Sequence, residues 1–308
     1  MKKKILIPLF AVLSIFSAIG IIVSNLLMFM KKKDDRFIQE REIKAGRLHV
    51  PDFESLPKQE VMLDSPFGYP LNCLFVSPHP TNKWMIFCHG ITENKYNSIK
   101  YMNLFIKKGY NAIIYDHRRH GNSGGNTSSY GFYEKWDLDV IVKELKKREG
   151  NDVIFGIHGE SMGAATTLLY AGCIRDDAAF YIADCPFSTL QGQVQYRIKK
   201  DIPLPSWLIL PIGSLFLKMR DGYSLHEVSP LAAVKQINNP ILFIHSENDD
   251  YIPVAMTKEL YEAKKGDKQL FISSKGAHAQ SFNENSAEYE KAIDHFLQSL
   301  PVQNDDRL

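Results

Sequence analysis

One stretch in the middle of the chain has the residue types that nucleophilic chemistry needs. Gly-Glu-Ser-Met-Gly occupies residues 159–163, after an apolar, β-branched run and before a run of small, helix-favouring residues. A serine at a tight strand-to-helix turn needs neighbours without side chains, so that its hydroxyl stays accessible. The N–H groups of the helix that follows would point at a developing oxyanion. Ser161 is therefore a candidate nucleophile, although Gly and Ser are also common in ordinary turns.

Two later turns supply candidates for the acid and the base that such a serine needs. The turn after a late apolar strand contains Glu247, Asp249 and Asp250, which compete for one role. A carboxylate in this turn can hydrogen-bond a histidine Nδ1, fix its tautomer and stabilise the imidazolium. A glycine-containing loop further along the chain contains His278. The chain order serine, acid, histidine is the one expected when all three lie at one edge of a parallel sheet.

The remaining histidines have structural explanations. His158 and His245 end predicted strands, where we expect structural hydrogen bonds, and His295 lies in an amphipathic helical segment. His117 and His120 have a spacing that resembles a metal site, but no set of carboxylate or cysteine partners accompanies them. We therefore expect no metal and no organic cofactor.

Composition indicates an ordinary globular chain. Its 308 residues are enough for one large domain with a sizeable core, and its formal net charge of +2 gives no reason to expect a nucleic-acid partner. Cys73, Cys88, Cys173 and Cys185 lack metal-ligand spacing. Buried free thiols are the expectation, with a Cys73–Cys88 disulfide as the alternative.

The N-terminus departs from this composition. Residues 5–30 contain no charged side chain and lie between Lys2-Lys3-Lys4 and Lys31-Lys32-Lys33. As a helix this run would be roughly 39 Å long, enough to cross a bilayer with some tilt. We expect a single-pass anchor over residues 1–33. A signal peptide cleaved after the small residues at 18–20 is the alternative, but the uncharged run continues well beyond them.

The orientation of this anchor is less constrained, because basic clusters flank both of its ends and the positive-inside comparison does not discriminate. With its short basic tail inside, the anchor would leave the rest of the chain outside, so we expect an extracytoplasmic domain at the cell membrane. Residues 34–58 are charged and polar, and we expect them to form a juxtamembrane linker. Residues 303–308 form a polar tail.

The periodicity of residues 59–302 predicts an α/β domain with a mostly parallel sheet and helices on both faces. A hairpin comes first, and strands then alternate with helices. The predicted strands are 60–64, 71–76, 83–88, 111–116, 153–157, 179–183, 240–245 and 269–272, and the predicted helices are 98–108, 132–148, 162–172, 254–263 and 287–300.

Residues 187–237 interrupt this alternation. The segment contains Pro203, Pro205 and Pro211 together with many apolar residues. We interpret it as a small helical cap inserted over a pocket, with simple packing of helices on the sheet as the alternative.

Over residues 60–300 the chain resembles the α/β-hydrolase fold superfamily. Within it, the chain is similar to membrane-anchored bacterial hydrolases that are grouped with serine aminopeptidase-like and acylglycerol-lipase-like proteins. The motifs that carry this resemblance are His89-Gly90, Asp116-x-Arg118-x-His120-Gly121-x-Ser123, Gly159-Glu160-Ser161-Met162-Gly163, Asp249-x-x-Ile252-Pro253 and Gly276-Ala277-His278.

The resemblance implies a role for each of these positions. Ser161 would be the nucleophile and His278 the general base and acid. Asp249 would be the orienting carboxylate rather than Asp250, because the family's acid usually precedes a hydrophobic-Pro pair at this spacing.

The resemblance also implies an oxyanion hole made by the backbone N–H groups of Ile91 and Met162. Arg119 departs from the pattern, since many relatives have glycine at that position.

The expected function is a serine hydrolase that cleaves a carboxylic ester or a related acyl bond through an acyl-enzyme. Its substrate would be a small molecule or an acyl lipid. A peptidase or amidase of the same fold is one alternative. A catalytically inactive, membrane-tethered binding domain is the other.

Overall fold

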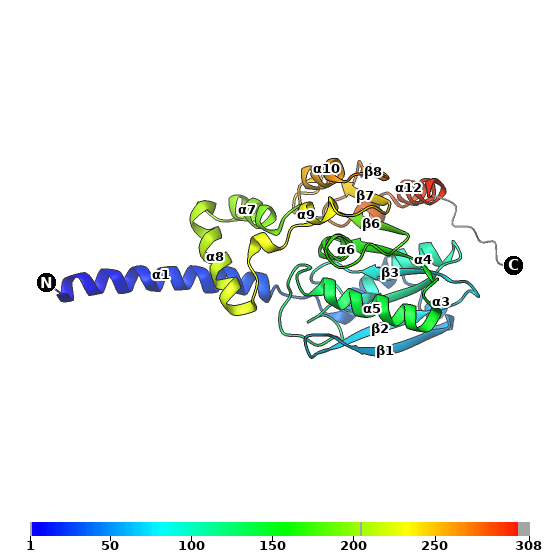
Figure 1. Cartoon of the computed structure of the whole chain (residues 1–308), viewed down its shortest axis with the longest axis horizontal. Coiled ribbons are helices and arrows are strands. Elements are labelled where there is room, and N and C mark those ends of the chain that lie inside the picture. The colour runs from blue at the N-terminus through cyan, green and yellow to red at the C-terminus, as the bar shows by residue number, and fades with distance from the viewer. Residues whose placement is uncertain (1, 204, 301–308) are drawn as a thin grey trace.

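The computed structural model describes residues 2–203 and 205–300, and in this part of the chain eight strands form one sheet in the order β1-β2-β4-β3-β5-β6-β7-β8 (Figure 1). β1 and β2 form an antiparallel hairpin, β2 pairs antiparallel with β4, and the other pairs are parallel. The predicted fold class is confirmed. The strands are β1 (Lys58–Asp64), β2 (Pro70–Val76), β3 (Lys83–Cys88), β4 (Asn111–Tyr115), β5 (Ile154–Glu160), β6 (Phe180–Asp184), β7 (Ile241–Ser246) and β8 (Lys268–Ser273).

Helices cover both faces of this sheet, because the central strands are apolar on both sides. One core cluster joins a sheet face to α5, α6, α9 and α10, and a second joins the opposite face to α3, α4 and α12. The helices are α1 (Lys2–Met28), α2 (Asp35–Lys44), α3 (Val50–Ser55), η1 (Lys95–Ser98), α4 (Ile99–Ile106), α5 (Glu134–Glu149), α6 (Met162–Cys173), α7 (Leu190–Asp201), α8 (Ser206–Asp221), η2 (Leu225–Glu227), α9 (Pro230–Val234), α10 (Val254–Ala263), α11 (Ser281–Glu284) and α12 (Ser286–Ser299).

The N-terminal helix α1 projects from the domain, and its C-terminal part packs on α8 (Figure 1). Small residues allow a close approach: a Cβ on Gly20 would lie 2.2 Å from the Phe216 ring, and one on Gly213 would lie 2.4 Å from Val23. Residues 10–28 of α1 are long and apolar enough to cross a membrane. Signal sequences and core helices also have this property.

Residues 34–58, expected to be a juxtamembrane linker, are folded onto the domain. They form α2 and α3, and Ile38, Leu48 and Phe53 are buried. The side chain of Asp34 caps α2 by accepting the N–H groups of Arg36 and Phe37. The segment is therefore a structural part of the domain, because its apolar residues find a face to pack on. The predicted polar tail at 303–308 lies outside the described residues.

The 187–237 insertion forms α7, α8, η2 and α9. α7 and α8 lie beside α1 at the end of the molecule from which α1 projects (Figure 1), and α9 packs against α6 and α10. Cys73, Cys88, Cys173 and Cys185 are free thiols, and Cys173 is the exposed one. The alternative of a Cys73–Cys88 disulfide is therefore wrong.

Candidate active site

The turn that contains Ser161 lies between β5 and α6, and its backbone is strained. Ser161 has φ 55° and ψ −114°, which a residue with a Cβ adopts only when its surroundings impose it. A Cβ on Gly159 would lie 2.3 Å from the Gly163 carbonyl oxygen, and one on Gly163 would lie 2.0 Å from the Cys88 carbonyl oxygen. Close backbone packing thus requires both glycines of the motif.

Ser161, His278 and Asp249 come together at the carboxyl edge of the sheet. Ser161 Oγ lies 2.9 Å from His278 Nε2, and His278 Nδ1 lies 2.7 Å from Asp249 Oδ2. The other carboxylate oxygen, Oδ1, accepts the backbone N–H groups of Tyr251 and Ile252, each at 2.9 Å. In this geometry a histidine can take a proton from the serine hydroxyl while the carboxylate fixes the histidine's orientation.

A second histidine holds the same carboxylate. His245 Nε2 lies 3.0 Å from Asp249 Oδ2, and His245 Nδ1 lies 2.7 Å from Thr257 Oγ1. Burial by itself would raise the pKa of Asp249, but the hydrogen bonds from His245 and His278 outweigh burial and hold this pKa below its ordinary value. Asp249 therefore stays ionised across the physiological range.

The two competing carboxylates point elsewhere. Asp250 is exposed, and its Oδ2 lies 2.9 Å from Lys200 Nζ. Glu247 is also exposed. Of the three acids in this turn, Asp249 alone contacts His278 among the described residues.

Two backbone N–H groups are available beside Ser161 for an oxyanion. Met162 is the first residue of α6, and Ile91 follows Gly90 in the loop after β3. Within the described residues, neither N–H donates to a protein acceptor. Gly90, Ile91 and Ser161 line the same pocket. This arrangement provides donors of the kind that stabilise a tetrahedral intermediate.

Buried histidines support the loop that contains Ile91. His89 Nδ1 lies 2.7 Å from the Gly90 carbonyl oxygen, and its Nε2 accepts the His117 N–H at 3.0 Å. His120 Nε2 accepts the Thr92 N–H at 3.3 Å. Burial lowers the pKa of His89 to about 4 and that of His120 to about 3, so both rings are neutral and can accept these bonds.

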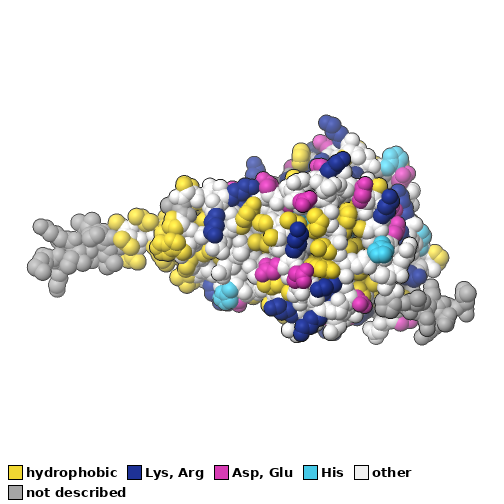
Figure 2. Space-filling model, turned by 90° about the horizontal axis from the view of Figure 1, so that it is seen from above, with side chains coloured by type: hydrophobic (Ala, Val, Ile, Leu, Met, Phe, Trp, Pro, Cys, Tyr) yellow, Lys and Arg dark blue, Asp and Glu magenta, His cyan; other side chains and the backbone are white. Residues whose placement is uncertain are grey.

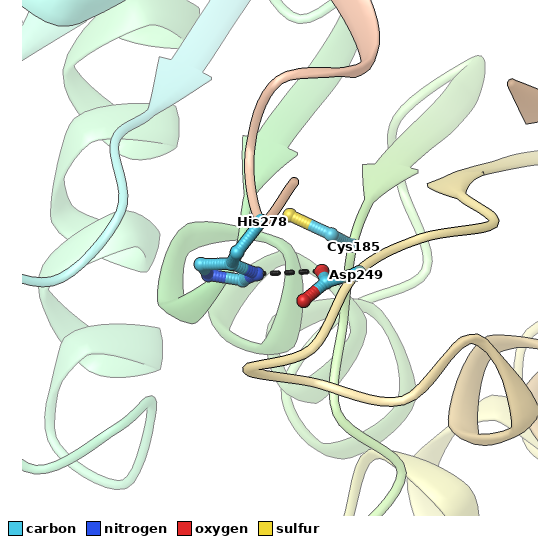
Figure 3. Close-up of side chains that lie close together, drawn as sticks. All are labelled: Cys185, Asp249 and His278. Carbon is cyan, nitrogen blue, oxygen red and sulfur yellow. Dashed lines mark hydrogen bonds and ion pairs between the residues drawn. The ribbon is translucent and has the colours of Figure 1, made fainter. Parts of the chain in front are cut away.

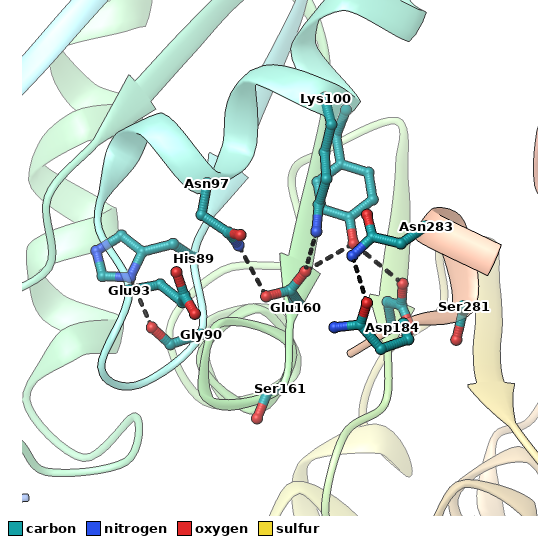
Figure 4. A network of polar contacts seen from close by, with 12 residues as sticks. His89, Gly90, Glu93, Asn97, Lys100, Glu160, Ser161, Asp184, Ser281 and Asn283 are labelled. Carbon is teal, nitrogen blue, oxygen red and sulfur yellow. Dashed lines mark hydrogen bonds and ion pairs between the residues drawn. The ribbon is translucent and has the colours of Figure 1, made fainter. Parts of the chain in front are cut away.

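Glu160, directly before the serine, is buried in a polar network (Figure 4). Its carboxylate lies 3.0 Å from Lys100 Nζ and accepts from Asn97 Nδ2 at 2.8 Å and the Tyr101 hydroxyl at 2.7 Å. Burial would raise the pKa of Glu160, but Lys100 and these hydrogen bonds lower it to about 2. The Ser161 N–H donates to the Asp184 carbonyl oxygen at 2.8 Å. These contacts hold the serine turn from both sides.

The pocket at Ser161 has a volume of about 360 Å³ and a basic rim formed by Lys33, Arg41 and Arg47. Arg41 Nη2 lies 2.9 Å from Glu93 Oε2, and Arg47 Nε lies 2.6 Å from a buried Glu42. Lys33 also pairs with Glu93. The sequence analysis did not predict this rim, because its residues belong to the segments predicted to be anchor and linker. The many charged residues of that region were the one signal for it in the sequence.

No residue of the 187–237 insertion is among the described residues that line this pocket. The insertion borders a neighbouring apolar groove instead.

The other histidines make structural contacts or have no exposed partner set. His158 Nε2 lies 2.8 Å from the Tyr289 hydroxyl, and His295 is exposed on α12. Both ring nitrogens of His120 are occupied by hydrogen bonds to the protein.

Cys185 lies beside the acid–histidine pair (Figure 3). Its Sγ, an Asp249 oxygen and a His278 nitrogen all lie within 4.8 Å of one another. Burial raises the pKa of the Cys185 thiol, and a protonated thiol is a poor metal ligand. The nitrogen of His278 that faces Asp249 is already hydrogen-bonded to it.

Known proteins resemble this chain in sequence. A family model described as "Serine aminopeptidase, S33" matches residues 79–218. The uncharacterized protein YqkD of Bacillus subtilis is 49% identical over 299 residues, which cover 97% of this chain and 98% of YqkD. The lysophosphatidylserine lipase ABHD12 of Xenopus tropicalis is 26% identical over 187 residues, covering 58% of this chain and 45% of that lipase, so the chain spans less than half of ABHD12.

Solved structures share the fold. The esterase Pf2001 of Pyrococcus furiosus superposes with a TM-score of 0.67 at 24% identity, covering 82% of this chain and 95% of the esterase. The acylaminoacyl peptidase of Pyrococcus horikoshii superposes with a TM-score of 0.62 at 20% identity, covering 83% of this chain and 44% of the peptidase. The YqkD identity over nearly the whole chain, together with the family model and these structures, places the chain in the family of YqkD within the α/β-hydrolase superfamily, and it is a hydrolase.

Proposed function

We propose that this protein is a membrane-associated serine hydrolase that cleaves a carboxylic ester through Ser161, His278 and Asp249. The observation that carries the proposal is the continuous hydrogen-bonded chain from Ser161 Oγ through His278 to Asp249, at a serine turn held by close backbone packing. Strain at a nucleophile is the kind of local cost that a fold retains for chemistry.

The reaction is acyl transfer to water. Ser161 Oγ attacks the carbonyl carbon while His278 Nε2 accepts the hydroxyl proton, and the N–H groups of Ile91 and Met162 stabilise the negative charge on the carbonyl oxygen. His278 then gives its proton to the leaving alcohol. In the second half His278 takes a proton from water, the hydroxide attacks the acyl-enzyme, and Ser161 leaves with the returned proton. Asp249 stabilises the imidazolium in both halves.

Esters are favoured over amides because an alkoxide is the easier leaving group to expel. Among the proteins that this chain resembles, one is a lysophosphatidylserine lipase, one is an esterase and one is an acylaminoacyl peptidase. An acyl lipid also fits an enzyme with a membrane-length N-terminal helix and a basic rim on its pocket. A peptidase or amidase of the same fold is the second candidate.

The anchor is part of this proposal. Residues 1–33 stay attached as a single-pass membrane anchor, with the catalytic domain outside the cytoplasm. Extraction of membranes with carbonate tests attachment, since release of the full-length chain into the soluble fraction contradicts it. Digestion of the domain by protease added to intact cells tests the side, and protection of the domain contradicts the extracytoplasmic placement.

A fluorophosphonate probe tests the serine chemistry. Labelling of the full-length chain that Ser161→Ala abolishes is the expected result. An absence of labelling supports a catalytically inactive binding domain instead.

A panel of p-nitrophenyl esters beside aminoacyl p-nitroanilides then tests whether the enzyme cleaves an ester or an amide bond. Turnover of the anilides at rates above those of the esters favours the peptidase.

A further inference from the structure

An apolar groove of about 840 Å³ lies between the end of α1 and α7, next to the active-site pocket. Val23 and Leu27 of α1 form one wall, and Leu190, Val194 and Ile198 of α7 form another. Its volume is within the range of sites that hold a small ligand. Polar side chains lie at its rim, among them Arg197 and Asp201, which form an ion pair with a distance of 2.6 Å.

The groove adjoins the pocket at Ser161, and Met30 and Tyr251 line both spaces. The Tyr251 ring centroid lies 5.0 Å from that of His278, and the Tyr251 N–H donates to Asp249. A molecule whose reacting group lies at Ser161 would therefore reach the groove by passing Tyr251 and Met30.

The position of α1 places this groove at the membrane. Phe16 of α1 contacts α8, with its ring 6.0 Å from that of Phe216. The uncharged run of α1 begins at Ile5, and residues 5–15 would span only about 17 Å at about 1.5 Å per residue. The hydrocarbon core of a bilayer is about 30 Å thick, so a core that begins near Ile5 would end near residue 24, within the segment of α1 that lines the groove.

The surface around this segment fits such a position. Ile22, Leu26 and Phe29 of the α1 region line the groove and are exposed, and Trp207 and Met219 are exposed on α8, the helix that packs on α1. Figure 2 shows hydrophobic side chains gathered where α1 leaves the domain. An exposed apolar surface of this kind marks an interaction site.

We propose that the α1–α7 groove binds the acyl chain of a membrane lipid substrate, which enters from the bilayer between α1 and α7 and places its ester carbonyl at Ser161. This rests on the proposed ester hydrolysis. The occupant is a single acyl chain because aliphatic side chains of α1 and α7 form two walls of the groove, the groove adjoins the pocket that contains Ser161, and α1 has membrane length. The basic rim then faces the polar head of the lipid.

The test compares two tryptophan variants of α7 in the full-length chain. Val194→Trp fills the groove, whereas Gln191→Trp adds the same side chain to an exposed position of the same helix outside the groove lining. The substrates are p-nitrophenyl acetate and p-nitrophenyl dodecanoate. We expect Val194→Trp to lower kcat/KM for dodecanoate by roughly tenfold or more, the scale of losing a few buried methylene contacts, and to leave acetate within about twofold. Gln191→Trp should match the wild type on both.

Equal losses on both esters by a Val194→Trp chain that still reacts with the fluorophosphonate would overturn the inference, as would no loss on dodecanoate. If Val194→Trp does not fold, an alkyl fluorophosphonate with a terminal diazirine tests the wild type. Photocrosslinks mapped to α7 and residues 22–30 support the groove, and crosslinks confined to other elements contradict it. A wild type that fails to react with a short fluorophosphonate contradicts the proposed function itself, which is a distinguishable result.

Discussion

The serine edge of the sheet and the α1–α7 groove lie next to each other but are built by opposite means. At the serine edge the side chains of Ser161, Asp249 and Glu160 are hydrogen-bonded to fixed partners and are nearly inaccessible to solvent. In the groove aliphatic side chains of α1 and α7 form two walls, and the Arg197–Asp201 ion pair lies among the lining residues. The first arrangement suits a reaction that needs atoms held in place. The second suits binding of a chain that varies in length and conformation.

The difference extends to where each region comes from in the sequence. The serine edge is built from strand ends and the loops directly after them, whereas the groove is built from the N-terminal helix and an insertion. Substitutions at the serine edge should therefore change rate, protonation and folding together. Substitutions at the groove and its apolar surroundings should change which substrate is used and leave the chemical step intact.

The largest expected effect is on the orienting acid. Asp249→Asn should lower kcat by roughly 10⁴-fold, because an amide in place of the carboxylate holds His278 in the wrong tautomer and cannot stabilise the imidazolium. Asp250→Asn is the matched control, since Asp250 is adjacent in sequence but contacts an exposed Lys200. Steady-state hydrolysis of p-nitrophenyl acetate measures both. A severe loss in the Asp250 variant with near-normal activity in the Asp249 variant would reverse the assignment.

The next effect is on folding rather than chemistry. Glu160→Gln leaves Lys100 buried without a counter-charge, and removing one partner of a buried ion pair destabilises a protein by roughly 3–5 kcal/mol. Thermal denaturation of the full-length variant in detergent measures the loss. Asp250→Asn again serves as the control, because its ion pair is exposed and should contribute little. Equal stability of the Glu160 variant and the wild type would show that the network is not needed for the fold.

A smaller effect should appear as the pH falls. His89 has a pKa of about 4 in the folded protein against an ordinary value of 6.5, so the unfolded chain binds its proton first. The stability that a neutral His89 provides is complete above pH 6.5 and is lost as the pH falls from 6.5 to 4, by on the order of 3 kcal/mol. The difference in melting temperature between the wild type and His89→Asn should therefore shrink over this range. A melting-temperature difference that stays constant from pH 7 to pH 4 would contradict the lowered pKa of His89.

Much of the serine edge was predictable because it depends on local chain geometry. Gly159 and Gly163 flank Ser161 since backbone atoms approach too closely for any Cβ, and this requirement is visible as a spacing. The alternation of apolar strands and amphipathic helices predicted the sheet. The structure then placed Asp249 and His278 at the same edge as Ser161, as their chain order suggested.

The pocket rim and the groove could not be predicted, because their contacts join residues far apart in the chain. Arg41 reaches Glu93 and Arg220 reaches Ser24, and no local pattern encodes either pair. Arg119 illustrates the same limit. Its φ of 68° is a backbone conformation that favours glycine, yet here its guanidinium donates to the Met30 carbonyl oxygen at 2.9 Å and ties this turn to the end of α1.

The smallest expected effect is at the apolar surface beside the groove. Trp207 lies on α8 with 74% of its area exposed. Tryptophan favours membrane interfaces, where its ring contacts lipid and its N–H contacts water, so this exposure suits a side chain that meets the membrane. Trp207→Glu should lower hydrolysis of a long-chain ester presented in lipid vesicles by only roughly three- to tenfold, since the anchor proposed for α1 would still hold the protein on the membrane. Hydrolysis of p-nitrophenyl acetate should not change.

Trp136 provides the matched control for this variant, because it is also exposed but lies on α5, a helix that packs on the sheet. Trp136→Glu makes the same chemical change and should leave both activities at wild-type levels. If the two variants lose vesicle activity equally, the loss reflects a general change in charge, and α8 has no special contact with lipid. If only the Trp207 variant loses activity on vesicles while both variants still hydrolyse p-nitrophenyl acetate, contact of α8 with the membrane helps the lipid substrate to reach the active site. The serine edge and the apolar surface would then be separable in function as they are in structure.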